Sequence, residues 1–288
     1  MERVLVVGAG FMGAGIAQVC AQAGYTVSLT DIDPAATARA LETIGWSVEK
    51  LSAKGVLNES PQQVLARITP EKDLVSAAQA DWVIEAVFED ESLKRDIFRE
   101  LDQRTRAETI LATNTSSIPI TRLAASTTRP ARVLGLHFFG PVPLMRLVEV
   151  VKGEQTSPQV FERGVAFVQS LGKTPLRVQR DVPGFVMNRI FSAAFREAVE
   201  LVEQGIATPE DIDAGMRLGY GWSVGPFEIA DLAGLDTVVR VGQSLRALGE
   251  EHLAASSHLI ESMVTQGRLG RKTGQGFYRY APDGRRVS

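Results

Sequence analysis

RVLVVGAGFMGAGIAQVCAQAGYTVSLTD, residues 3–31, is the stretch that decides the fold of this 288-residue chain. A β-branched run at 3–7 ends in a glycine-rich turn, an amphipathic helix is expected at 11–23, and a second strand-like run follows at 26–30. This order is that of a βαβ unit, in which a helix connects two parallel strands. The stretch therefore predicts a parallel sheet.

The glycines of this stretch have the spacing G-x-G-x-x-G, formed by Gly8, Gly10 and Gly13 with Phe11 and Met12 between the last two. After a strand and at the start of a helix, the first glycine allows a tight turn, the second lets a pyrophosphate approach the backbone, and the third lets the helix pack on the strand. Alone, the pattern marks only a turn. In this context we predict that these five residues bind a dinucleotide at the helix N-terminus.

Asp31 closes the second strand, where dinucleotide-binding folds carry an acidic residue. Its carboxylate is expected to accept hydrogen bonds from the adenosine ribose hydroxyls. The same negative charge would repel a 2′-phosphate, so the sequence favours NAD(H) over NADP(H).

Strands and helices continue to alternate up to about residue 178. Further strands are expected at 82–87, 109–113 and 174–178, and helices at 34–55, 90–104 and 158–171, whereas 58–73 is polar and expected to be irregular. The alternation predicts an α/β, Rossmann-like, doubly wound and mostly parallel sheet with an antiparallel addition.

The pattern changes near Val182 from alternation to helices. Helices are expected at 185–204, 209–218, 226–233, 235–248 and 257–266, before a tail rich in Gly and Lys/Arg that is expected to be extended. We therefore predict an NAD-binding domain over 1–182 and an all-α domain over 183–288. The helix at 185–204 is apolar over a wide arc, which favours cover by its own domain and by another subunit.

Composition excludes several function classes. A net charge of −3 and a pI near 5.8 give no basic footprint for nucleic acid. No apolar run reaches the roughly 18 residues of a membrane span. Because the first strand is expected to begin at once, no signal or transit peptide is expected. The single Cys20 excludes an intramolecular disulfide and favours a cytoplasmic location. With three scattered histidines, no metal site is expected.

The segment VLGLHFFGPVPLMRLVEVV, residues 133–151, reads as two apolar strands joined by a Gly-Pro-Val-Pro turn. Each strand carries one residue that is out of place there, His137 in the first and Glu149 in the second. A buried carboxylate needs a partner. A hairpin centred on Pro143 places the two side chains opposite each other on one face.

The His137–Glu149 pair has two interpretations. It is either a satisfied buried pair that fixes the hairpin or a dyad in which the carboxylate orients the imidazole. An NAD-dependent alcohol oxidation removes a hydroxyl proton while hydride leaves the same carbon, so it needs a positioned base. Imidazole serves as a base near pH 7.

Three polar residues are weaker candidates. Asn114 and Ser116 follow a parallel strand at the edge where open α/β sheets bind ligands, although a polar loop that caps the next helix fits as well. Asn188 interrupts the apolar run FVMNRIF, either as a site residue or as an ordinary helix-surface residue.

The chain resembles a known family in several segments. VVGAGFMGAGIAQVCAQAGYTVSLTDID, ATNTSSIPIT, GLHFFGPVPLMRLVEVV, DVPGFVMNRI, GPFEIADLAGLD and RKTGQGFY are similar, in this order and over essentially the whole chain, to the short-chain L-3-hydroxyacyl-CoA dehydrogenases, including the 3-hydroxybutyryl-CoA dehydrogenases. The resemblance implies NAD-dependent interconversion of (3S)-3-hydroxyacyl-CoA and 3-oxoacyl-CoA in fatty acid or acyl-CoA metabolism, including β-oxidation.

The resemblance also assigns roles. It implies that His137 is the catalytic base, Glu149 its partner, Ser116 a ligand of the substrate oxygen beside the nicotinamide, and Asn188 a further catalytic contact from the helical domain. Other positions match cofactor and substrate contacts of the family: Asp31, Glu89, Lys94 and Lys272 for NAD, and Ser47 and Lys54 for CoA. The family forms homodimers through the helical domain, which also binds substrate.

One position departs from the family. After HFF the family usually has Asn, whereas this chain has Gly140 and lacks that side-chain donor. Two alternatives to the implied activity stay open. One is a related dehydrogenase of free 3-hydroxy acids or sugar acids, which share a similar two-domain plan but against which Ser47 and Lys54 argue. The other is an NAD-binding protein that lost catalysis through the change at Gly140.

Overall fold

The computed structural model describes residues 2–253 and 257–287 of the chain. It divides into two compact units, Met1–Val182 and Pro183–Ser288. Among the helices in the described ranges, none combines the length and the apolar character that crossing a membrane requires.

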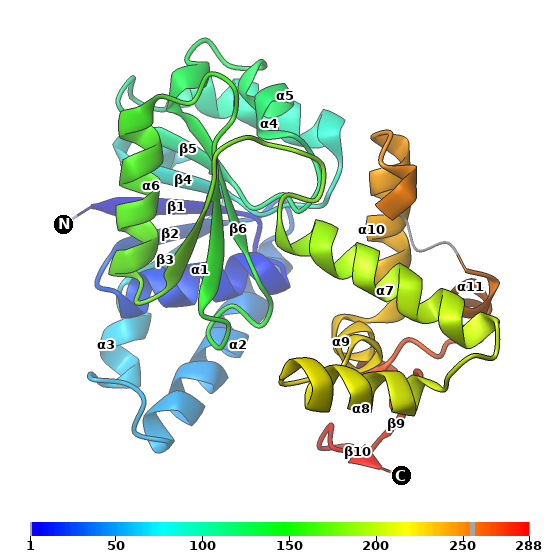
Figure 1. The fold of residues 1–288 in the computed structure, drawn as a ribbon. Coiled ribbons are helices and arrows are strands. Elements are labelled where there is room, and N and C mark those ends of the chain that lie inside the picture. Colours follow the sequence, from blue (N-terminus) through cyan, green and yellow to red (C-terminus); the bar gives the residue numbers. More distant parts are fainter. Residues whose placement is uncertain (1, 254–256, 288) are drawn as a thin grey trace. The chain divides into compact units, whose positions relative to one another are not determined.

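The first unit is built on one eight-stranded sheet with the order β3-β2-β1-β4-β5-β6-β7-β8 (Figure 1). Neighbouring strands are parallel except β6 and β7, so the last two strands run against the others. The strands are β1 (Arg3–Val7), β2 (Thr26–Thr30), β3 (Ile68–Glu71), β4 (Trp82–Glu85), β5 (Ile110–Thr113), β6 (Val133–Phe138), β7 (Leu147–Val151) and β8 (Thr174–Val178). The predicted Rossmann-like, mostly parallel sheet is confirmed.

Helices cover both faces of this sheet. They are α1 (Phe11–Gln22), α2 (Pro34–Ala53), α3 (Pro61–Leu65), α4 (Glu91–Arg104), α5 (Ile120–Ala124) and α6 (Pro158–Ser170), with short 3-10 turns η1 (Val75–Gln79) and η2 (Pro130–Arg132). Right-handed crossovers from β1 to β2 and from β4 to β5 leave the central strand pair in opposite directions, so α1 and α4 cover opposite faces. The carboxyl ends of β1 and β4 therefore form the switch point where such sheets bind ligands.

The segment 58–73 was expected to be irregular, and that prediction is wrong. Ser60 and Gln63 form a capping box at the start of α3, and Ile68–Glu71 form the edge strand β3 beside β2. The strand has four residues and contains Pro70, which an edge strand tolerates because its outer side needs no ladder hydrogen bond. A run of four residues is too short to show the alternation of apolar and polar residues by which strands are predicted.

The second unit is helical, as predicted. Its elements are α7 (Met187–Glu203), α8 (Pro209–Tyr220), α9 (Pro226–Ala233), α10 (Leu235–Ala247), η3 (Glu251–Leu253), α11 (His258–Thr265), η4 (Arg271–Thr273), β9 (Arg279–Tyr280) and β10 (Arg286–Val287). Phe195, Phe227 and Phe277 pack edge to face in its core, with ring centroids 4.6 Å apart for the last two. Helix α7 begins later than expected because Gly184 and Phe185 have φ values of 75° and 46°.

The C-terminal tail is more structured than the extended chain that the sequence indicated. Asp231 accepts hydrogen bonds from the backbone N–H groups of Phe277 and Tyr278 and from the Tyr280 hydroxyl. Asp213 accepts the Tyr278 hydroxyl at 2.7 Å. Two buried aspartates from α8 and α9 thereby fix the tail to the helices.

Candidate active site

The glycine-rich loop after β1 has two glycines that packing requires. Gly8 has φ +103°, and a Cβ there would lie 2.6 Å from the Ala86 carbonyl oxygen. A Cβ on Gly13 would lie 1.8 Å from the Gly8 carbonyl oxygen. The loop therefore lies directly against β4 and α1, as the motif predicts.

Gly10 is different, because the described chain gives no steric reason for it. Its φ is −70°, and a Cβ there would meet no atom within 4 Å. Gly10 is also the N-cap of α1, where no side chain of the described residues caps the helix, so the first turn offers its N–H groups outward. An open glycine at an uncapped helix N-terminus fits the pyrophosphate of a dinucleotide.

Large apolar side chains are exposed where the chain leaves the strands at the same sheet edge, at the start of α1 and on two loops. Phe11 after β1, Ile32 after β2 and Phe88 after β4 are 69%, 102% and 87% exposed. Exposed apolar side chains gathered in this way are typical of ligand-binding surfaces. These loops fit the apolar parts of the same cofactor.

Asp31 connects the glycine-rich loop to the end of β2. Its Oδ2 accepts the Ala9 N–H at 2.7 Å, and its Oδ1 accepts the Asp33 N–H at 2.9 Å. The half-buried carboxylate is thereby held at the switch point. That location agrees with the ribose contact expected of it.

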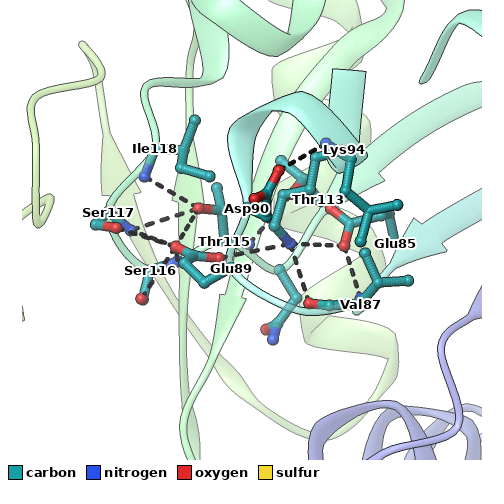
Figure 2. A network of polar contacts seen from close by, with 12 residues as sticks. Glu85, Val87, Glu89, Asp90, Lys94, Thr113, Thr115, Ser116, Ser117 and Ile118 are labelled. Atoms are coloured by element: carbon teal, nitrogen blue, oxygen red, sulfur yellow. Dashed lines mark hydrogen bonds and ion pairs between the residues drawn. The ribbon is translucent and has the colours of Figure 1, made fainter. Parts of the chain in front are cut away.

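A buried ion pair lies at the carboxyl end of β4 (Figure 2). The Lys94 ammonium donates to Glu85 Oε1 at 2.6 Å, and the two side chains are 1% and 0% exposed. Glu85 also accepts the Val87 N–H and the Thr113 hydroxyl, each at 2.7 Å. This carboxylate therefore joins α4, the loop after β4, and β5.

Glu89 extends this network to the loop that contains Ser116. Its Oε2 lies 3.5 Å from the Lys94 ammonium. Its Oε1 accepts the Thr115 hydroxyl at 2.6 Å and the N–H groups of Ser116 and Ser117 at 2.8 and 3.0 Å. Partial burial raises the pKa of the Glu89 carboxyl, but the Lys94 charge and these hydrogen bonds outweigh it and hold that pKa below its usual range.

The His137–Glu149 pairing is confirmed as a contact. The two residues are direct cross-strand partners in β6 and β7, and His137 Nδ1 lies 2.6 Å from Glu149 Oε2. Their side chains are 7% and 0% exposed. An ionised carboxylate only accepts, so with Glu149 in that form Nδ1 is the donor, and a neutral imidazole then has its lone pair on Nε2. The geometry is that of an oriented base.

The two candidates after β5 take different positions. The Asn114 Oδ1 accepts the Phe138 N–H at 2.9 Å, so this side chain joins the ends of β5 and β6. Ser116 is half-buried in the loop that Glu89 holds. Because β5 and β6 are parallel neighbours, this loop and His137 lie at the same sheet edge.

The remaining candidates lie on other elements. Ser47 and Lys54 belong to α2 and its C-terminal end, and Lys54 is exposed. Asn188 is the second residue of α7 in the second unit, where Lys272 pairs with Asp236. Among the described residues, no group of His, Cys, Asp and Glu could hold a metal ion.

Glu85 is the residue that the sequence interpretation missed. The signal was present, because Glu85 is a carboxylate inside the buried strand WVIE. Glu149 was found by the same irregularity in β7.

Two family models match the chain. The 3-hydroxyacyl-CoA dehydrogenase NAD binding domain matches residues 3–182, and the 3-hydroxyacyl-CoA dehydrogenase C-terminal domain matches residues 184–280. Together they span both units.

Individual proteins are similar over nearly the full length. The "Probable 3-hydroxybutyryl-CoA dehydrogenase" of Deinococcus radiodurans is 46% identical over 96% of this chain and 99% of its own. Human "Hydroxyacyl-coenzyme A dehydrogenase, mitochondrial" is 40% identical over 97% of this chain and 91% of its own. The crystal structure of (S)-3-hydroxybutyryl-CoA dehydrogenase from Ralstonia eutropha has a TM-score of 0.89 at 41% identity, covering 98% of this chain and 99% of that one.

Proposed function

The chain belongs to the 3-hydroxyacyl-CoA dehydrogenase family, and we propose on that premise that its substrate is a short (3S)-3-hydroxyacyl-CoA such as 3-hydroxybutyryl-CoA. It is an NAD-dependent oxidoreductase, as the NAD binding domain match over residues 3–182 indicates. The names of the Deinococcus radiodurans and Ralstonia eutropha relatives support the short acyl chain.

The observation that carries the proposal is the 2.6 Å contact between His137 and Glu149 at the ligand-binding edge of a dinucleotide fold. When bound, NAD supplies a hydride acceptor for C3 of the alcohol. His137 Nε2 takes the proton of the 3-hydroxyl group, and Glu149 stabilises the imidazolium that forms. In the reverse direction, the imidazolium protonates the developing alkoxide.

The Ser116 hydroxyl donates to Glu89 Oε1 at 3.2 Å in this structure, and we propose that it turns to hydrogen-bond the substrate oxygen beside the nicotinamide. Its loop is held by Glu89 Oε1. The resemblance gives both Glu89 and Lys94 cofactor contacts. We keep that contact for Glu89, but because Lys94 is 1% exposed and bonded to Glu85, we assign Lys94 a positioning role through Glu89 instead. Asp31 is proposed to bind the adenosine ribose, and Gly8, Gly10, Phe11, Met12 and Gly13 to line the pyrophosphate side of the cofactor.

Further roles rest on the resemblance alone. We propose that Ser47 and Lys54 contact CoA, that Asn188 contacts the substrate, and that Lys272 contacts the cofactor. Residues 183–288 are proposed to bind substrate and to form a homodimer. A cytoplasmic location, supported by the single buried Cys20, and a place in fatty acid β-oxidation complete the proposal.

The direct test is NADH oxidation with acetoacetyl-CoA and, separately, with free acetoacetate. We expect turnover with the thioester and at most about a hundredth of that kcat/KM with the free acid, since loss of the CoA contacts lowers transition-state binding. Equal rates would favour a dehydrogenase of free hydroxy acids. NADH binding without turnover of either compound would favour the non-catalytic alternative. Longer 3-oxoacyl-CoA substrates would define the chain-length preference.

A further inference from the structure

The turn of the β6–β7 hairpin, residues 140–145, packs directly against the N-terminal half of α1. A Cβ on Gly15 of α1 would lie 2.8 Å from Val142 Cβ and 3.0 Å from Val142 Cγ2. A Cβ on Gly140 of the turn would lie 2.6 Å from Phe11 Cε1 and 3.4 Å from Met12 Sδ. Each element therefore has a glycine opposite a side chain of the other.

These contacts identify the side chain that lies beside Gly140. The far edge of the Phe11 ring fills the space that a side chain at position 140 would occupy. Side chains at positions 11 and 140 are thus mutually exclusive in the observed geometry. The absence of a side chain at Gly140 therefore makes room for the Phe11 ring of the same chain.

Lys173 fixes the same turn independently of α1. Its ammonium donates to the carbonyl oxygens of Val142 at 2.7 Å and Met145 at 2.6 Å, and the residue is 9% exposed. Val142 itself is 1% exposed. A turn held by a buried cation has little freedom to move away when a contact with α1 becomes too close.

We propose that the two contacts, Gly15 with Val142 and Phe11 with Gly140, set the distance between the cofactor and the His137–Glu149 pair. Helix α1 presents its N-terminus to the pyrophosphate, and the turn directly follows the strand that carries His137. Phe11, Gly15, Gly140 and Val142 are therefore positioning residues for hydride transfer. This inference rests on the proposed dehydrogenase function.

The two contacts predict different responses to an added methyl group. Gly15→Ala meets a buried, β-branched side chain, so the turn or the helix must shift. Gly140→Ala meets the edge of the ring of Phe11, a residue that is 69% exposed, so the ring can turn aside and the backbone shifts less. Misplacement of a reacting group by about 1 Å costs on the order of a hundredfold in rate.

The experiment compares Gly15→Ala with Gly215→Ala, a helical glycine in α8 whose Cβ would meet no atom within 4 Å. Wild-type turnover of acetoacetyl-CoA is measured first, so that a failure of the proposed function is recognised before the variants are compared. We expect Gly15→Ala to lower kcat at least about tenfold, to keep the Kd for NADH measured by cofactor fluorescence within about threefold, and to raise the isotope effect with 4-deuterated NADH. Gly215→Ala should match wild type.

A double-mutant cycle tests the second contact. Gly140→Ala should lower kcat less than Gly15→Ala, and the same change should have no further effect in a Phe11→Ala background, where the ring is gone. The pH profile of kcat should stay that of wild type throughout. The inference is overturned if Gly15→Ala keeps wild-type kcat, if its NADH affinity falls in proportion to kcat, or if Gly140→Ala has equal effects in both backgrounds. Coupling in the urea unfolding free energies of the same cycle reads the Phe11–Gly140 contact without any turnover.

Discussion

The Glu85–Lys94 pair and the His137–Glu149 pair are alike in geometry. Each has a contact of 2.6 Å, and the four side chains are between 0% and 7% exposed. Both carboxylates lie in buried strands of the same sheet. The difference lies in the partner, because an ammonium only donates hydrogen bonds whereas a neutral imidazole also has a ring nitrogen that can accept a proton.

That difference separates two uses of a buried acid–base pair. Glu85 accepts from Lys94, Val87 and Thr113 at once, an arrangement that fixes loops and gains nothing from a change of charge. Glu149 contacts an imidazole whose second ring nitrogen can serve as a base. The first pair holds the site in place, and the second carries the proton in the proposed reaction.

The largest expected effect on stability comes from Lys94→Met. It leaves the Glu85 carboxylate buried without its cation, so the free energy of unfolding should fall by about 3–5 kcal/mol. Urea denaturation measures this loss. Lys72→Met, at an exposed lysine, is the control and should change stability by less than about 0.5 kcal/mol.

Adding Glu85→Gln to Lys94→Met should recover part of the lost stability. The double variant removes the unpaired charge and keeps an acceptor for Val87 and Thr113. A loss below about 1 kcal/mol for Lys94→Met alone would mean that Glu85 has no need of its cation, and the two pairs would then not differ as described.

Glu149→Gln should have the opposite balance of effects, with a large loss of activity and a small loss of stability. We expect kcat with acetoacetyl-CoA to fall at least about a hundredfold, since the imidazolium loses its countercharge. The loss of stability should be smaller than for Lys94→Met, because the neutral imidazole that remains needs no counterion. A stability loss as large as that of Lys94→Met, with kcat preserved, would assign the His137–Glu149 pair to structure alone.

The smallest expected effect is a pH dependence at Glu89. Because its pKa is lower in the folded chain than the unfolded value of about 4.3, its contribution to stability is present above that value and is lost as the pH falls through the folded pKa. Urea midpoints measured between about pH 3 and 6 should therefore depend less on pH in Glu89→Gln than in wild type. Identical pH profiles would show that the Lys94 charge and the hydrogen bonds from the Ser116 loop do not lower the Glu89 pKa in the folded chain.

Much of the fold could be predicted because the decisive elements are long or punctuated. The β1–α1–β2 unit has glycine signals at both turns, and the β6–β7 register follows from a turn that Gly140 and Pro143 delimit. The edge strand β3 was missed since four residues with an internal proline give no period. The late start of α7 depends on the left-handed backbone at Gly184 and Phe185, which no pattern of side chains announces.

The site likewise has contacts that the sequence predicts and contacts that it does not. The pairing of His137 with Glu149 was predictable because strand periodicity fixes which residues oppose each other. Glu85 carried the same signal, but its partner Lys94 lies on a helix, and no register relates a helix residue to a strand residue. The space beside Gly140 was unpredictable for a related reason, because the Phe11 ring reaches it from a helix more than a hundred residues earlier in the chain.

The most direct test of the comparison is the turnover of His137→Gln with acetoacetyl-CoA and NADH, measured together with its Kd for NADH. Glutamine keeps a polar side chain opposite Glu149 but supplies no base. We predict a fall in kcat of at least about a hundredfold, with NADH binding within about threefold of wild type and an unchanged urea midpoint. Near-wild-type turnover in this variant would contradict the assignment of His137 as the group that carries the proton.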